Sequence, residues 1–141
     1  RSNRRGNQEK NILFTLVFLF FGVFGFSQGV PCTVANGINS GTIQVQLFAS
    51  PMGSCQPGCA TATYCVFPGQ VISIPPCGPD FFVWTYAVVT PTTDDCSVPC
   101  PPASTTVVSP TGCLPAIASS IHCHAGPYTS NFVGPTTLIV F

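Results

Sequence analysis

The chain has 141 residues, and its few charges are distributed very unevenly. All four basic side chains lie in the first ten residues: Arg1, Arg4, Arg5 and Lys10. Residues 28–141 contain no Lys, Arg or Glu, and their three acids are Asp80, Asp94 and Asp95. Because nucleic-acid binding draws most of its affinity from Lys and Arg at phosphates, this composition excludes a nucleic-acid partner and disfavours phosphorylated substrates and anionic membrane surfaces.

An uncharged apolar run at 12–26 (ILFTLVFLFFGVFGF) follows the basic residues. A basic segment before a short apolar run predicts a secretory signal peptide, and the run is shorter than the roughly 20 residues of a membrane-spanning helix. Gly25 and Ser27 place small side chains at the −3 and −1 positions, so we expect cleavage between Ser27 and Gln28. The sequence therefore predicts a cleaved signal peptide at 1–27 and a single secreted domain at 28–141, with an uncleaved anchor as the alternative.

Strand patterns begin with the alternation of apolar and polar residues at 42–48, which predicts a half-buried strand. A second strand is expected at 70–74, between a turn signal at 67–69 and a proline-rich run at 75–79. The segment 81–90 (FFVWTYAVVT) is apolar on both faces, as in a central strand. The segment 90–102 is too rich in proline for regular pairing and predicts a loop pinned by cystines. Further strands are expected at 103–109, 117–123, 128–133 and 136–141.

The spacing of these segments predicts the fold class. Turn signals recur every 8 to 12 residues, and no stretch after the signal peptide has helical periodicity. This pattern predicts an all-β domain, namely an antiparallel β-sandwich of about seven to nine strands with almost no helix.

Nine cysteines lie in this domain: Cys32, Cys55, Cys59, Cys65, Cys77, Cys96, Cys100, Cys113 and Cys123. In an exported chain such a density indicates disulfides that staple a small core. The odd number leaves one cysteine free, paired with another molecule, or bound to something else, and the sequence leaves the connectivity open. Zinc ligation is the alternative, because Cys55 with Cys59 and Cys96 with Cys100 have permissive spacing.

The sequence His122-Cys123-His124 offers a second candidate metal site. Side chains two residues apart in a strand point to the same side, so His122 and His124 would form a bidentate half-site. The alternative is a pair of structural histidines at a strand end, touching water and backbone.

Three rings at Phe82, Trp84 and Tyr86 alternate within the predicted central strand. On a regular strand they would share one face and could form a platform for stacking a sugar ring. The alternative is a sandwich core in which the tryptophan packs against a cystine.

Residues for catalysis are scarce. Hydrolysis of a glycosidic bond usually needs two carboxylates facing each other, whereas Asp94 and Asp95 are neighbours in a predicted loop and Asp80 has the position of a turn residue. No G-x-S-x-G segment is present, and a Cys-His pair would need a free thiol. We therefore expect no enzymatic activity and no cofactor; a Ca²⁺ site at the two adjacent aspartates has weak support.

From Cys32 to Phe141, the pattern resembles small, cysteine-rich, exported bacterial β-sandwich proteins of uncharacterised function. The segment 128–137 (YTSNFVGPTT) resembles their final hairpin, and the apolar run ends in Phe-Ser-Gln as in the signals of secreted bacterial proteins. The resemblance implies an immunoglobulin-like or fibronectin-like sandwich that acts outside the cytoplasm, and it transfers no catalytic or binding residue.

These patterns lead us to expect a secreted, non-catalytic structural or adhesive protein of the cell surface or extracellular matrix. Its expected partners are itself or other extracellular proteins, with no membrane contact after signal cleavage. The low charge, the odd cysteine and an apolar strand at 137–141 favour self-association. A carbohydrate-binding module using the aromatic strand and a metal-binding protein are the alternatives.

Overall fold

A computed structural model describes residues 29–141. The predicted signal peptide and its cleavage site lie outside this described part. Within it, ten strands and one short 3₁₀ helix, η1 (Pro102–Ser104), make up the regular structure. The strands are β1 (Cys32–Asn36), β2 (Thr42–Pro51), β3 (Cys59–Ala60), β4 (Tyr64–Val66), β5 (Val71–Ile74), β6 (Phe82–Thr92), β7 (Thr106–Val108), β8 (Ile117–His122), β9 (Gly126–Phe132) and β10 (Thr137–Val140).

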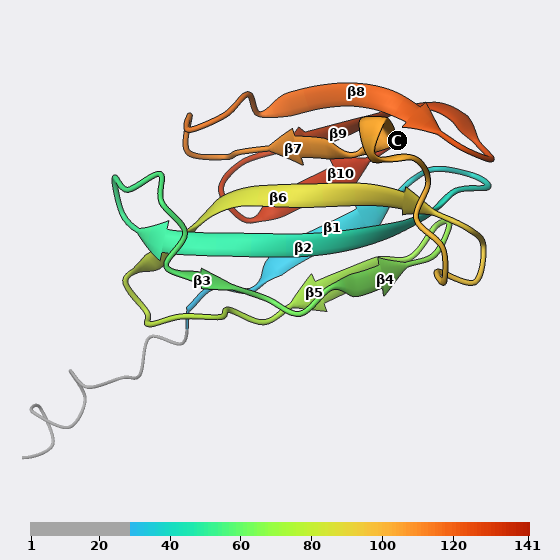
Figure 1. Cartoon of the computed structure of the whole chain (residues 1–141). Helices are drawn as coiled ribbons and strands as arrows, with labels where there is room; N and C mark the ends of the chain where they lie inside the picture. The colour runs from blue at the N-terminus through green and yellow to red at the C-terminus, as the bar shows by residue number, and fades with distance from the viewer. Residues whose placement is uncertain (1–28) are drawn as a thin grey trace, which may run out of the picture.

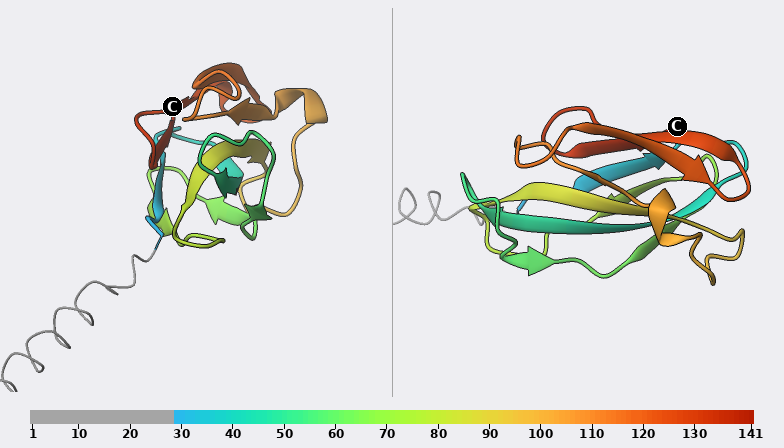
Figure 2. Two further views of the ribbon diagram at one scale, coloured as in Figure 1. Left: turned by 90° about the vertical axis from the view of Figure 1, so that its left-hand side faces the viewer. Right: turned by 45° about the horizontal axis from the view of Figure 1, so that its top comes forward.

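The strands form two sheets that pack face to face. Sheet A has the order β5-β1-β10-β9-β8, and sheet B has the order β3-β2-β6-β7 with β4 also paired to β2. All strand pairs are antiparallel except β1 and β10, which run parallel. Figure 1 shows the long strands β2 and β6 in front of β1, and the left view of Figure 2 looks along the strands.

The core follows from the alternation of side chains along each strand. In β2 the side chains of Ile43, Val45 and Leu47 are fully buried, while the glutamines between them lie on the outer side. Sheet A supplies the facing layer of the same core cluster, with Val34, Ile74, Tyr128, Phe132, Leu138 and Val140. Burying each aliphatic side chain contributes about 1.5–3 kcal/mol, so one continuous apolar core stabilises both sheets.

The predicted all-β, disulfide-stapled sandwich is confirmed, but the described residues form ten strands where about seven to nine were expected, one pair of them is parallel, and the strand boundaries differ in detail. The strands β1, β3 and β4 were not predicted; β3 and β4 are too short to show an alternating pattern. The strand β6 continues through Pro91 to Thr92, beyond the predicted end at 90. Because β7 pairs only with Ala87–Val89, the neighbour of β6 at Pro91 on that side is the loop at Pro99 and Cys100, where the Cys100 N–H donates to the Pro91 carbonyl at 2.8 Å. The missing N–H of Pro91 therefore interrupts no strand ladder.

Eight of the nine cysteines form four disulfides at strand ends, edge strands and loops. The pairs are Cys55–Cys113, Cys59–Cys77, Cys65–Cys96 and Cys100–Cys123. The loop 93–101 contains Cys96 and Cys100, so the prediction of a cystine-pinned loop after β6 is confirmed. These crosslinks close the margins of the sandwich, and the central layer between the sheets is left to apolar side chains.

Neutral hydrogen bonds join the two sheets at the same margins. The buried Asn36 of β1 donates through Nδ2 to the carbonyls of Gly41 (2.7 Å) and Val66 (2.9 Å), and its Oδ1 accepts from the N–H of Ile38 (3.0 Å). On the other side, Thr106 of β7 and Ser130 of β9 share a buried hydroxyl–hydroxyl bond of 2.8 Å. Within residues 29–141, no buried side-chain nitrogen or oxygen lacks a hydrogen-bond partner.

We predict that Asn36→Ala lowers the free energy of unfolding by about 2–4 kcal/mol, because two buried carbonyls and one N–H lose their partner. Urea unfolding measures this change. The control is Asn131→Ala, which removes an amide from the outer face of sheet A and should change stability by less than about 0.5 kcal/mol. Equal losses in the two variants would contradict the role given to Asn36.

Candidate functional site

A β-bulge in β6 decides how its three rings are placed. Phe48 of β2 pairs with Tyr86, but the next residue, Ala49, pairs with Trp84, so Thr85 is the extra residue. Ala49 lies on the core side of β2, and its partner Trp84 therefore also faces inward. The prediction that Phe82, Trp84 and Tyr86 share one face is wrong, because the bulge reverses the alternation between Trp84 and Tyr86.

The rings consequently belong to two different surroundings. Trp84 is only 4% exposed and belongs to the core cluster, and its indole Nε1 donates to the Val30 carbonyl at 2.9 Å. Phe82 packs against the same cluster. Tyr86 lies on the outer face of sheet B, where its ring stacks on Phe48 with the centroids 4.6 Å apart.

Phe82 and Trp84 line a cavity of about 260 Å³ at the end of the sandwich where β2 ends and β6 begins, which we call the Asp80 end. The cavity also touches Val30, the loop between β5 and β6, and Pro135 and Thr136 between β9 and β10. Its lining is mostly apolar, and Asp80 is its one ionisable residue. Four segments that are distant in the sequence thus meet around one hollow.

The phenyl ring of Phe82 has a fixed position in the wall of this cavity. It lies against Gly58 and Gly78, and a Cβ at Gly78 would come within 2.5 Å of the ring carbon Cδ2. The disulfide Cys59–Cys77 joins the two segments that carry these glycines. Only glycine at positions 58 and 78 leaves room for the Phe82 ring, so these two glycines determine where the ring lies in the cavity wall.

A second hollow adjoins the cavity and is more open. Gly29, Pro76, Gly78 and Asp80 line both, and Ser73 lines only the open one. Asp80 is an exposed residue and lines both hollows, so it lies where the apolar cavity meets the open groove.

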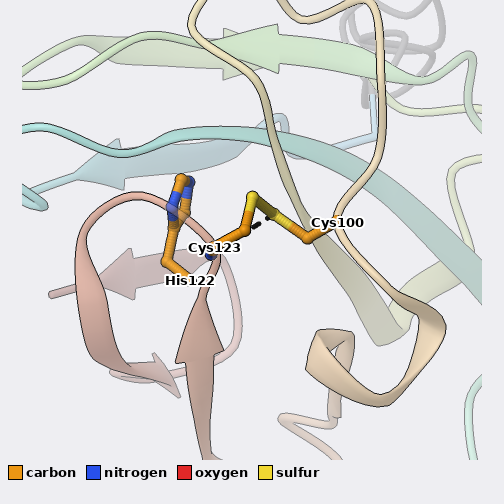
Figure 3. Close-up of side chains that lie close together, drawn as sticks. All are labelled: Cys100, His122 and Cys123. Carbon is orange, nitrogen blue, oxygen red and sulfur yellow. Dashed lines mark hydrogen bonds between the residues drawn. A yellow bond between two sulfur atoms is a disulfide. The ribbon is translucent and has the colours of Figure 1, made fainter.

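At the opposite end of the sandwich, His122 lies beside the disulfide Cys100–Cys123, as Figure 3 shows. The ring of His122 is 1% exposed, and its Nε2 lies 2.8 Å from the Thr42 carbonyl of sheet B. Its Nδ1 accepts from the N–H groups of His124 (3.0 Å) and Ala125 (3.2 Å). Because Nδ1 accepts these two N–H groups, Nε2 is the ring nitrogen that donates to the Thr42 carbonyl, and both ring nitrogens are engaged.

The expectation that His122 and His124 point to the same side of a strand is wrong, and the backbone contacts of His122 match the alternative of a structural histidine at a strand end. The strand ends at His122, so His124 lies in the turn before β9 and the two side chains do not follow the alternation of a strand. His122 is close to the sulfurs of Cys100 and Cys123, all three ligand atoms lying within 4.8 Å of one another. Both sulfurs are consumed by the disulfide, and a metal would have to break the backbone contacts of His122.

The free cysteine is Cys32, and it is fully buried in the core at the start of β1. Burial raises the pKa of its thiol to about 12, so the thiol is protonated at neutral pH. An accessible thiol for crosslinking two molecules, which the odd cysteine count left open, is not found at Cys32.

The aspartates are divided between the two ends of the domain. Asp80 precedes the eleven-residue strand β6, and Asp94 and Asp95 follow it, which separates them by about 30 Å. Hydrogen bonds from Thr93 Oγ1 and from the hydroxyl and N–H of Ser97 lower the Asp95 pKa to about 2. That carboxylate organises its own loop, whereas Asp80 lines the cavity and the groove described above.

The outer face of sheet A carries no charge. One row across the sheet consists of Val71, Ala35, Ile139, Asn131 and Ile117, and further rows add hydroxyl groups. Its most exposed apolar residues are Ile121 (64%), Val71 (63%), Phe141 (56%) and Ile117 (54%). The strand β8, with Ile117 and Ile121, forms the edge of the sheet.

Comparison of the chain with protein-family models, curated proteins and solved structures finds no match. The resemblance to exported bacterial sandwich proteins therefore stays a prediction. In the described residues, no helix has the length and hydropathy that crossing a bilayer requires.

Sequence reasoning missed the cavity at the Asp80 end. Its residues come from segments around 30, 49, 76–84 and 135, and no local pattern connects them. The one signal was the segment 75–80 (PPCGPD), in which rigid prolines, a glycine and an acid stand together before an aromatic strand.

We predict that His122→Ala lowers the free energy of unfolding by about 2–4 kcal/mol, because the contact with Thr42 and the two turn N–H groups are lost. The control His124→Ala removes an exposed side chain and should have an effect below about 0.5 kcal/mol in the same urea titration.

The same titration tests the metal hypothesis. A ligand that binds only the folded state raises the urea midpoint of unfolding. Because backbone groups engage both ring nitrogens of His122, we expect Zn²⁺ to leave the midpoint of the oxidised protein unchanged. A Zn²⁺-dependent rise that disappears in either histidine variant would restore the predicted site.

Proposed function

We propose that this chain is a secreted, non-catalytic structural or adhesive protein of the cell surface or extracellular matrix. The observation that carries the proposal is the uncharged outer face of sheet A, on which exposed aliphatic and aromatic side chains stand among hydroxyl and amide groups. Charged surfaces keep proteins apart, so their absence lowers the cost of association. The edge strand β8 adds unpaired backbone groups beside Ile117 and Ile121.

The disulfides support the location. Four disulfides in a domain of this size are consistent with an extracellular environment, because thiols in a reducing compartment stay reduced. Such crosslinks also keep a marginal core folded outside the cell, which a structural or adhesive protein requires. The fully buried Cys32 makes the proposed association non-covalent.

A second copy of the chain is the partner that the face of sheet A suits best, because a neutral surface has no electrostatic penalty against an identical one. We predict concentration-dependent dimers or larger species in sedimentation-velocity experiments on the oxidised protein. The substitutions Ile117→Lys and Ile121→Lys should each shift the protein toward monomer, since like charges would then face each other across the interface.

The matched control is Val107→Lys, which adds the same charge to the outer face of sheet B, where Val107 is 38% exposed. It should leave the association intact. A protein that sediments as a monomer at every concentration, or that responds equally to all three lysines, would count against self-association through sheet A.

A further inference from the structure

We propose that the cavity at the Asp80 end, together with the groove beside it, binds an apolar group that carries a single positive charge. The site is distinct from the outer face of sheet A, so this inference does not rest on the proposed structural or adhesive function. The ligand class is an organic ammonium or guanidinium with an apolar body, such as a free amine or a Lys or Arg side chain of a partner.

The size and lining of the cavity point to one ring or one short alkyl chain. Pockets for drug-sized molecules measure about 300–1,000 Å³, and this cavity of about 260 Å³ lies just below that range. Trp84, Phe82 and three prolines are among the residues that line it. An apolar group that leaves water for this wall gains about 25 cal/mol for each Å² buried.

The charge of the ligand follows from Asp80. Residues 29–141 contain no Lys or Arg, and both histidines lie at the other end of the sandwich. Asp80 therefore has no basic side chain of the described domain within reach, although it stands at the mouth of an apolar hollow. A cation on the ligand would form an ion pair with Asp80. The aromatic residues of the cavity would also attract a cation.

The same features argue against a sugar as the ligand. A sugar ring presents several hydroxyl groups, each of which needs a partner when it loses water. The cavity offers few polar side chains, Asp80 and Thr136, and the indole N–H of Trp84 already donates to Val30. A largely apolar body with one charged end matches this lining better.

The site is also preorganised. The ring of Phe82 is confined by Gly58 and Gly78, and the disulfide Cys59–Cys77 holds the two segments together. The bond from Trp84 to the Val30 carbonyl ties two further lining residues together. Because the wall is already ordered, binding does not include the entropy cost of ordering it.

Fluorescence offers a direct test, because Trp84 is the only tryptophan of the chain and lines the cavity. We expect phenethylammonium chloride to change the Trp84 emission of the oxidised protein saturably. Its neutral analogue 2-phenylethanol should bind about two- to fivefold more weakly, which is the range of a partly exposed ion pair, and added NaCl should narrow the difference.

The deciding variant is Asp80→Asn, which keeps the shape of an exposed side chain and removes its charge. It should lower the affinity for phenethylammonium to that for 2-phenylethanol and leave the alcohol unaffected. The control Asp94→Asn changes the net charge equally at the far end of β6 and should have no effect.

A comparison of two probes distinguishes a free amine from the side chain of a protein partner. Tighter binding of the tripeptide acetyl-Pro-Lys-Pro-amide than of phenethylammonium would indicate a protein partner lying along the groove, and the reverse order would indicate a free amine. The proposal is overturned if no cation gives a saturable change in Trp84 emission, or if Asp80→Asn and Asp94→Asn change the affinity for phenethylammonium equally. It is also overturned if cellobiose binds while neither phenethylammonium nor the tripeptide does.

Discussion

The two sheets of this domain are held together without a single Lys or Arg side chain in residues 29–141, and the rest of the structure follows from that constraint. The centre of the sandwich is an apolar cluster in which Ile43, Val45 and Leu47 meet the inner face of sheet A. At the margins, where other proteins can place ion pairs, neutral groups and cystines join the layers. Asn36 and His122 each bind backbone atoms of sheet B from sheet A, and Cys100–Cys123 adds a covalent link beside His122.

The same constraint shapes the surface. Because the three acids lie in loops at the ends of β6, both outer sheet faces present only neutral side chains. This neutrality supports the proposed association, for which sheet A also offers the exposed Ile117 and Ile121 on its edge strand, and it leaves Asp80 as the one ionisable residue that lines the cavity. The two proposed interactions therefore have different origins, since one depends on the absence of charge and the other on a single unpaired carboxylate.

Sequence patterns predicted the parts of this structure that depend on local alternation. The strand at 42–48 shows its buried face directly, because apolar residues recur at every second position. The bulge at Thr85 has no such signature, so the rings of Phe82, Trp84 and Tyr86 could not be assigned to their faces. The expectation that strand alternation aligns His122 with His124 is wrong for a related reason, since the strand ends at His122 and His124 belongs to a turn. Disulfide partners and the Asp80 cavity depend on contacts between distant segments, which spacing along the chain cannot reveal.

The urea midpoint of unfolding, followed by Trp84 fluorescence before and after complete reduction, tests most directly whether cystines replace ionic contacts. Four disulfides at about 2–4 kcal/mol each amount to roughly the whole stability of a small domain. The oxidised protein should unfold cooperatively at a high urea concentration that does not depend on NaCl, and the reduced protein should be unfolded without urea. A reduced protein that unfolds cooperatively at the same midpoint would contradict the account.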